Sequence, residues 1–210
     1  MNSPITALLR PKSIAVVGAS PKPGSFGATL SGAIQSLGYA GGLHLVNPRY
    51  ERIGDMPCHP SLAAVPGGAD CAAFAVGAAL IVDAVEAAAE AGVKGAVLFG
   101  RAHGDTPDGR SRMDAIRSIA RGAGMAICGA NCMGFLNLHD RLQMTAMPFR
   151  DLPLPSGVAL ISHSGSSWSG LVGNRRQMGF DYAVSAGQEL ATGIADYIRH
   201  FLQQTEVRVI

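Results

Sequence analysis

The fold is decided by the stretch Ser13-Ile-Ala-Val-Val-Gly-Ala-Ser-Pro-Lys-Pro-Gly-Ser-Phe-Gly27. It begins with a β-branched and apolar run, Ile14 to Val17, of the kind that forms a strand buried on both faces. A polar loop follows, and from Gly27 the apolar spacing of residues 28–37 predicts a helix. This order brings free backbone N–H groups and the positive end of a helix dipole together, which is typical of a phosphate site. The alternative is an ordinary turn that only needs glycine; because Lys22 also lies in the loop, we favour the anion site.

The spacing of the glycines bears on the ligand. A dinucleotide fingerprint reads G-x-G-x-x-G, and an acidic residue about 20 residues later binds the ribose. Here the glycines lie at positions 18, 24 and 27, so the loop is longer. After the second predicted strand, residues 43–46, the expected carboxylate is missing and the chain reads Asn47-Pro48-Arg49. Because an arginine can bind a phosphate bidentately, the sequence disfavours NAD and favours a ligand with an additional phosphate near its ribose. Both NADP and coenzyme A (CoA) fit that description.

Composition excludes several classes of protein. The chain has 210 residues, of which 48% are hydrophobic and 15% charged, so it is globular rather than disordered. A net charge of +2 is too small to indicate a nucleic-acid partner. The sequence has no uncharged apolar run of membrane-spanning length and no signal pattern, so we expect a cytoplasmic protein that does not enter the membrane. The four cysteines lack C-x-x-C spacing, so we expect no zinc site, and in the cytoplasm we expect no disulfides.

Strands and helices alternate along the chain. We expect further strands at residues 71–76, 95–99 and 125–128, a possible sixth at 135–137, and helices at 5–9, 80–91 and 108–121. Residues 47–69 are expected to form loops, with one short helix near 61–64. This alternation predicts an α/β fold with a parallel, doubly wound sheet, whose right-handed crossovers place the loops after the strands at one edge. We expect the following loops to form one site: residues 18–27, 47–49, 77–78, 100–105 and 129–134.

A second α/β pattern follows a predicted linker at residues 139–156. Its expected strands are residues 158–161, 182–184 and 207–210, and its expected helices are 167–178 and 190–202. The chain would then end on the third strand of a second domain, so we expect a sequence truncated inside that domain.

The turn of the second domain allows three interpretations. Ser164, Gly165 and Ser166 could seat an anion, or the serines could cap the following helix. A serine nucleophile beside His163 is the weakest of the three, because the G-x-S-x-G elbow is absent.

Two other loops carry polar side chains. Asn131 and Cys132 could contact a ligand, or Asn131 could cap a turn through its side chain. His103 and Asp105 could do acid–base chemistry, but we favour a solvated pair in a loop.

Six segments resemble the ADP-forming (NDP-forming) acyl-CoA synthetases, the superfamily that includes the succinyl-CoA synthetase α-subunit. They cover nearly the whole chain in order: Ser13–Gly27, Val46–Tyr50, Gly129–Asn137, Gly157–Gly165, Val184–Gln188 and Gln204–Ile210. The resemblance implies a Rossmann-like CoA-binding domain, residues 1–145, followed by the N-terminal part of a flavodoxin-like ligase domain, residues 155–210. The chain departs from the family at Gly77 and Ala130, where the family has proline, and at residues 100–103.

The resemblance also implies a reaction. The intact enzyme would convert a small carboxylic acid, CoA and ATP to acyl-CoA, ADP and phosphate, through an acyl phosphate and a phosphohistidine. Ser164, Gly165 and Ser166 would face one of these phosphates. His163 does not match the family's phosphorylated histidine, so we assign no catalytic residue and no metal ligand, and expect the chain alone to be inactive. The implied CoA-binding residues are Gly18, Ala19, Ser20, Pro21, Lys22, Gly24, Ser25, Phe26, Gly27, Asn47, Pro48, Arg49, Val76, Gly77, Asn131 and Cys132.

The same resemblance predicts the partners. Mg-ATP or ADP would bind an ATP-grasp portion, as a β-type subunit or a fused domain, and we expect an oligomer.

Two other functions stay open. One is an NADP-dependent oxidoreductase, which the long loop and the missing Tyr-x-x-x-Lys dyad disfavour; the other is a module that senses CoA or a nucleotide.

Overall fold

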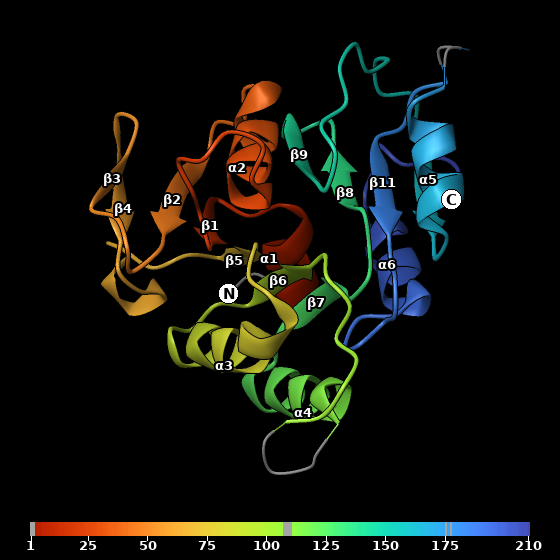
Figure 1. The fold of residues 1–210 in the computed structure, drawn as a ribbon. Coiled ribbons are helices and arrows are strands. Elements are labelled where there is room, and N and C mark those ends of the chain that lie inside the picture. The colour runs from red at the N-terminus through yellow and green to blue at the C-terminus, as the bar shows by residue number, and fades with distance from the viewer. Residues whose placement is uncertain (1–2, 107–110, 175, 177) are drawn as a thin grey trace.

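Two β-sheets organise the chain (Figure 1). The computed structural model describes residues 3–106, 111–174, 176 and 178–210. The larger sheet has the strand order β3-β4-β2-β1-β5-β6-β7, and the smaller has the order β10-β11-β8-β9. The mixed α/β fold with a large parallel sheet is therefore confirmed.

Six strands of the large sheet run parallel to one another: the five named in this paragraph and β4 (Met56–His59). Side chains on its first strand alternate between two cores, as the period of two in a strand requires. Ile14 and Val16 pack on the side of α1 and α2, whereas Ala15 belongs to the core under α3 and α4. The strands are β1 (Ser13–Val17), β2 (Gly42–Val46), β5 (Cys71–Phe74), β6 (Gly95–Leu98) and β7 (Ala126–Gly129). The helices are α1 (Pro4–Leu9), α2 (Phe26–Ser36), α3 (Ile81–Glu90) and α4 (Arg112–Ala123), with one-turn helices η1 (Leu62–Ala64) and η2 (Ala78–Leu80).

The small sheet is mixed. Strands β10 and β11 are parallel, whereas β11 pairs with β8, and β8 with β9, in antiparallel fashion. A helix covers each face: Trp168 of α5 packs on one side, and Tyr197 and Phe201 of α6 on the other. The core under α6 is continuous with that under α1 and α2, so the two sheets share buried side chains. The elements are β8 (Gly134–Asn137), β9 (Leu142–Thr145), β10 (Ala159–Ser162), β11 (Tyr182–Ser185), α5 (Gly165–Val172) and α6 (Ile194–Phe201).

The structure corrects the prediction that residues 47–69 contain no strands. A short hairpin, β3 (Arg52–Ile53) with β4 (Met56–His59), adds to the edge of the large sheet. The hairpin was missed because its strands are short and because Pro57 lies within β4. Proline is found in strands mainly at sheet edges, so the sequence here resembles that of a loop. The predicted short helix is present as η1.

The linker prediction for residues 139–156 was wrong where it covers β9. This strand is fully buried although it contains Gln143 and Thr145, which hide the alternation of a strand. The Gln143 amide donates to Ser36 Oγ and to the Phe149 carbonyl, so its burial is compensated. The predicted strand at residues 135–137 exists as β8, but it pairs in the small sheet.

Three predictions in the second pattern need correction. Residues 207–210 form no strand: Val209 makes an isolated bridge to Val158. The helix predicted at 167–178 ends at Val172, because Gly173 follows, and the helix predicted at 190–202 begins only at Ile194. In the helix predicted at 108–121, residues 108–110 lie outside the described residues, and α4 begins at Arg112. The domain bounds 1–145 and 155–210 stay a prediction.

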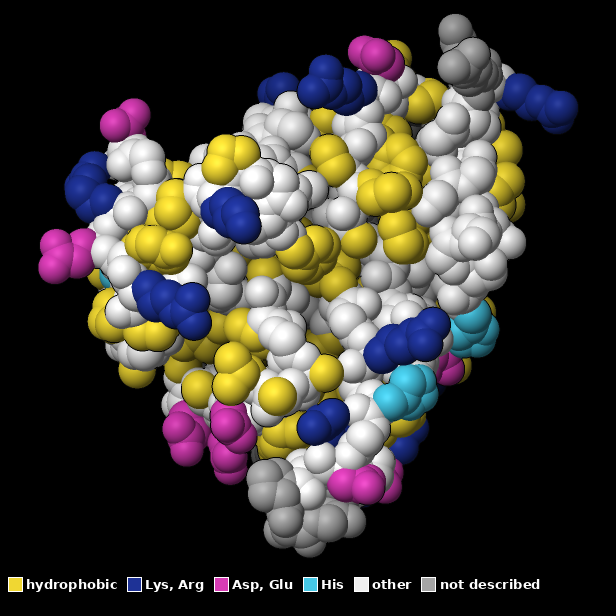
Figure 2. All heavy atoms as spheres, in the orientation of Figure 1, with side chains coloured by type: hydrophobic (Ala, Val, Ile, Leu, Met, Phe, Trp, Pro, Cys, Tyr) yellow, Lys and Arg dark blue, Asp and Glu magenta, His cyan; other side chains and the backbone are white. Residues whose placement is uncertain are grey.

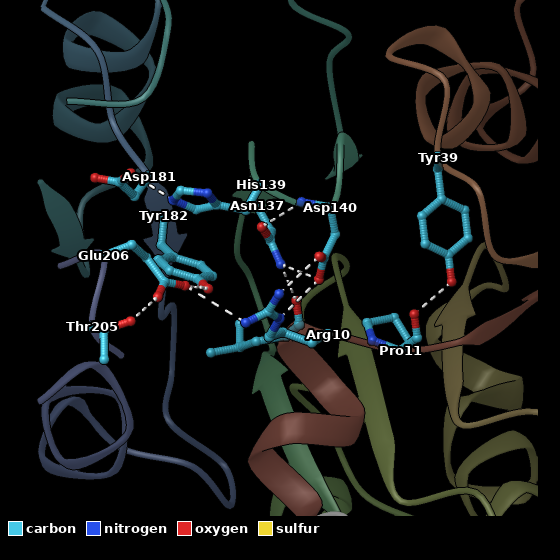
Figure 3. A network of polar contacts seen from close by, with 11 residues as sticks. Arg10, Pro11, Tyr39, Asn137, His139, Asp140, Asp181, Tyr182, Thr205 and Glu206 are labelled. Atoms are coloured by element: carbon cyan, nitrogen blue, oxygen red, sulfur yellow. Dashed lines mark hydrogen bonds and ion pairs between the residues drawn. The ribbon is translucent and has the colours of Figure 1, made fainter. Parts of the chain in front are cut away.

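A polar network joins the two sheets through α1 (Figure 3). The Arg10 guanidinium donates two hydrogen bonds of 3.0 Å to the Asp140 carboxylate and lies 3.6 Å from Glu206. Tyr182 Oη is 2.8 Å from Glu206, and His139 Nε2 is 2.6 Å from the buried Asp181. Half-buried charged pairs of this kind fix the position of the elements that carry them more than they add to stability.

The surface is of mixed character. On the face in Figure 2, hydrophobic side chains gather at the centre, and basic and acidic ones are scattered around them.

In the part of the chain that the structure describes, no helix is long and apolar enough to cross a membrane. Within those same residues, no group of three or more His, Cys, Asp or Glu side chains is placed to hold a metal ion.

Candidate functional site

The loops after the parallel strands meet at the carboxyl edge of the large sheet. Strand β1 lies between β2 and β5, so the connections that follow β1 and β5 leave in opposite directions. Such a switch point leaves a crevice in which α/β proteins bind ligands. The predicted glycine loop, residues 18–25, begins at this place.

Two glycines let the loop and α2 approach the sheet closely. Gly18 has a φ of +89°, and a Cβ there would lie 2.6 Å from the Ala75 carbonyl oxygen after β5. A Cβ on Gly27 would collide with the Gly18 carbonyl oxygen. Both positions therefore require glycine, which explains why this stretch decides the local fold.

The loop ends in a well-formed helix cap. Ser25 Oγ accepts from the Ala28 N–H at 3.3 Å and donates to the Lys22 carbonyl at 2.7 Å. The first N–H groups of a helix have no partner within it, so those of Phe26 and Gly27 are left for a ligand. Lys22 is exposed, and among the described residues its ammonium has no hydrogen-bond or ion-pair partner. Amides, a helix dipole and a free cation are the elements from which anion sites are built in proteins.

The second loop is locked to the first by Asn47. Its side-chain amide donates to the Ala19 carbonyl at 2.7 Å, and its side-chain oxygen accepts from the Arg49 N–H at 3.0 Å. This side chain is therefore committed to the protein itself. Arg49 is exposed, and within the described part of the chain its guanidinium contacts no partner, so it is available to a phosphate. Pro48 is exposed between them.

The loop after β5 lies against the start of the glycine loop. Val76 Cγ1 would be 3.1 Å from a Cβ at Gly18. Gly77 is exposed and is the N-cap residue of η2. Both residues thus border the crevice without contributing a polar side chain.

A pocket of about 770 Å³ opens between the two sheets. Of the predicted site residues it brings together Phe26, Asn131, Cys132, Gly165 and Ser166. The remaining predicted residues do not line it: Gly18, Ala19, Ser20, Pro21, Lys22, Gly24, Ser25, Gly27, Asn47, Pro48, Arg49, Val76, Gly77 and Ser164. The predicted residues thus divide into a group around the glycine loop and a separate pocket, and Phe26 belongs to both.

Asn131 and Cys132 both line the pocket but differ in their exposure to solvent. Asn131 is exposed and has a left-handed backbone, φ 53°, which asparagine tolerates better than most residues. Cys132 is buried, and its thiol donates to the Leu98 carbonyl at 3.4 Å. The hydrogen bond with Cys128, together with burial, raises the pKa of the Cys132 thiol well above its ordinary value. A neutral thiol is a poor nucleophile, so Cys132 acts here as a wall residue.

The start of α5 forms the opposite wall. Ser164 is the N-cap, and its Oγ accepts from the Ser167 N–H at 3.2 Å. Of the three interpretations of this turn, the cap is thus the one that the hydrogen bonds show for Ser164. The amides of Gly165 and Ser166, at the first two positions of α5, have no partner within the helix and lie at the pocket.

Several pocket residues were not predicted. Phe99 packs edge-on against Phe26 with ring centroids 5.1 Å apart. Ser169 lies one helical turn after Ser166, so the helical spacing of the two serines in the sequence could have identified it as a pocket residue. His163, considered only beside a nucleophile, lines the pocket, and its Nε2 lies 2.8 Å from the Glu189 carboxylate. Met133, Ala146 and Met147 also line it; the last two follow β9, which was not foreseen.

Comparison with known proteins defines the family. The CoA binding domain family matches residues 12–137, more than half of the chain. The chain belongs to this family. The family of the succinyl-CoA ligase like flavodoxin domain matches residues 155–210. The CoA-binding domain thus occupies the part of the chain that contains the large sheet.

The relatives that the chain resembles include CoA ligases and a CoA synthase. The chain is 30% identical over 100% of its length to a trans-feruloyl-CoA synthase from an unknown prokaryotic organism, of which it covers 30%. It is 30% identical over 98% of its length to the α-subunit of an ADP-forming acetate–CoA ligase I from Pyrococcus furiosus, covering 46%. The dinucleotide-forming acetyl-CoA synthetase 1 of Ca. Korarchaeum cryptofilum, in complex with phosphate and ADP, superposes with a TM-score of 0.87 at 27% identity, covering 100% of this chain and 45% of the synthetase. The chain therefore spans less than half the length of these relatives.

Proposed function

We propose that the chain is the CoA-binding portion of an ADP-forming acyl-CoA synthetase, an acid–thiol ligase. The observation that carries the proposal is that an exposed anion site and a pocket of about 770 Å³ adjoin at Phe26. CoA has the matching shape, because a nucleotide with several phosphates is joined to a long, narrow thiol arm. NADP also has the phosphates but has no arm of this kind to fill the pocket.

The nucleotide end would lie over the exposed loops. The phosphates bind at the start of α2, on the N–H groups of Phe26 and Gly27 and on Lys22, because these groups have no protein partner. Arg49 meets the phosphate on the ribose. Asn47 acts indirectly, since its hydrogen bonds hold the two loops together.

The pantetheine arm would enter the pocket past Phe26 and Phe99. Its thiol would then lie among Asn131, Cys132 and the start of α5. The free amides of Gly165 and Ser166 are suited to the phosphate of an acyl phosphate, which would bring the acyl group to the thiol. At this point the CoA thiol would attack the acyl carbon: the C–S bond forms, the C–O bond to the phosphate breaks, and the thiol proton leaves with the released phosphate.

The remaining parts of the reaction lie outside this chain. The phosphorylated histidine, the Mg-ATP site on an ATP-grasp β-type subunit or fused domain, and the choice of the small carboxylic acid are assigned to the intact, oligomeric enzyme. The α-subunit relative supports a partner subunit. The four free, buried cysteines fit a reducing compartment, so we place the protein in the cytoplasm.

Calorimetric titration with CoA, 3′-dephospho-CoA and NADP tests the proposal. We expect CoA to bind, and both removal of the 3′-phosphate and Arg49→Ala to weaken binding by about tenfold, because each removes one charge-assisted contact. Arg52→Ala is the matched control, since Arg52 is also exposed but donates to the Asp55 carbonyl. Binding of NADP without CoA would indicate an oxidoreductase and contradict the proposal.

A further inference from the structure

A second cavity, of about 510 Å³, lies away from the CoA loops. It is enclosed by the start of α1, the C-terminal half of α4, residues 190–192 and α6. Residue Ala126, at the amino end of β7, lines it, whereas the proposed CoA pocket adjoins the carboxyl end of the same strand. The two cavities are therefore separate sites at opposite ends of β7.

The inner wall of this cavity is apolar. Ala120, Met125 and Leu190 are each less than 5% exposed as residues, and Ile5 is half-buried beside them. Polar and charged side chains complete the lining, so the cavity combines an apolar wall with polar groups, as small-molecule sites do.

The rim of the cavity carries one cation without a counter-charge. Arg117 and Arg121 are one turn apart on α4, and Arg199 lies on α6. Arg117 is 2.9 Å from Asp114, and Arg199 is 2.9 Å from Asp196. Over the described ranges, Arg121 has no hydrogen-bond or ion-pair partner, and a free guanidinium presents a fork that matches a carboxylate.

We propose that this cavity is a second ligand site, which takes a small carboxylate with an apolar body. The carboxylate pairs with Arg121, and the body lies on Ala120, Met125 and Leu190. One uncompensated guanidinium matches a single negative charge. Because Arg117 and Arg199 are already paired with carboxylates, the rim offers, among the described residues, no second free cation for a phosphate dianion.

Polar groups at the far side give the site further selectivity. Thr192 Oγ1 accepts from the Ile127 N–H at 2.9 Å, which leaves the hydroxyl hydrogen free to donate to a ligand. His200 is buried at the cavity, and among the described residues its Nε2 has no hydrogen-bond partner. Both groups suit a ligand that carries oxygen atoms in addition to its carboxylate.

Titration of the ¹⁵N-labelled chain with benzoate and with hexanoate, followed by NMR, tests the proposal. At least one probe should shift the amide signals of residues 124–126 and 190–192 saturably, and benzamide, which has the same body without the charge, should bind at least tenfold more weakly. Arg121→Gln should weaken the carboxylate by about tenfold. Ala191→Trp, which fills the cavity from an exposed position, should abolish binding, and Arg52→Gln is the charge-matched control.

Three results would overturn the proposal. The first is the absence of saturable shifts with both carboxylates. The second is equal affinity for benzoate and benzamide, or no effect of Arg121→Gln. The third is a set of shifts confined to residues 130–133 and 163–166, which would place the carboxylate in the CoA pocket instead.

Discussion

His163 Nε2 lies 2.8 Å from Glu189 Oε1, so the turn before α5 is fastened to the loop before α6. The same carboxylate oxygen accepts from the Ile194 N–H at 2.7 Å, the first residue of α6. Glu189 thus joins the proposed acyl-phosphate end of the CoA pocket to the start of a helix. It does so from a left-handed backbone, φ 49°, which costs free energy in a non-glycine residue.

Replacing Glu189 tests this link. Glu189→Ala removes the acceptor of Ile194 N–H, and we expect the free energy of unfolding to fall by about 1–2 kcal/mol. Glu189→Gln keeps an oxygen acceptor and should lose less, while the backbone strain is the same in both variants. Urea denaturation followed by circular dichroism measures the difference. Equal stability of the two variants would show that this acceptor contributes nothing to α6.

The glycine loop gives a prediction in which two glycines serve as a matched pair. Gly18→Ala combines a strained φ of +89° with a Cβ 2.6 Å from the Ala75 oxygen, so we expect a loss of roughly 2–4 kcal/mol in stability. Gly24→Ala has a φ of +76° but no atom within 4 Å of the new Cβ, so only about 1 kcal/mol of strain is expected. Thermal denaturation of both variants decides whether the close approach matters. If Gly24→Ala destabilises the chain as much as Gly18→Ala, steric contact with the loop after β5 is not the cause.

The glycine loop shows what sequence can predict. Its strand, turn and helix follow one another locally, and short-range rules define each of them. Strand β9 shows the limit of prediction from sequence. Gln143 can be buried there because its side chain hydrogen-bonds Ser36, which is distant in sequence, and Phe149, which lies in an irregular segment. Since Ala146 and Met147 follow this strand, one wall of the proposed CoA pocket could not be foreseen. The two family matches follow one another in the order that the resemblance implies. The pairing of β8 with β11, in contrast, depends on contacts between segments that are far apart in sequence.

A buried histidine predicts the dependence of stability on pH. Burial, followed by the charge of Arg10, lowers the pKa of His200 below its ordinary value, and burial likewise lowers that of His44. The unfolded chain therefore binds more protons than the folded chain at mildly acidic pH. The stabilisation is present above about pH 6.5, the ordinary value, and is lost as the pH falls below it.

His200→Phe should reduce this dependence. Phenylalanine keeps the aromatic contact with Phe201 and has no proton to gain. Urea denaturation at pH 7.5, 6.5 and 5.5 should show a shallower decline for this variant than for the parent chain. His103→Asn, in an exposed loop, is the control and should follow the parent. The same slope in all three proteins would assign the pH dependence to other groups.

The two proposed sites are joined by residues 187–193. The Gln188 N–H donates to the Ala130 carbonyl at 2.8 Å, beside the CoA pocket, and the Leu190 N–H donates to the Gly129 carbonyl at 3.0 Å. Leu190 and Thr192 then line the second cavity. A ligand that orders this segment from the cavity side also orders the neighbours of Asn131, so its binding should favour CoA.

If both proposals hold, saturating benzoate, or hexanoate where that is the probe that binds, should tighten CoA binding by about fivefold, the lower end of usual coupling between sites. Because such coupling is reciprocal, saturating CoA should tighten the carboxylate by the same factor, which calorimetry can check in both directions. Arg121→Gln should bind CoA as the parent chain does but lose the response to the carboxylate, since Arg121 lies outside the CoA loops. If a carboxylate binds the cavity and leaves the affinity for CoA unchanged, residues 187–193 do not couple the two sites.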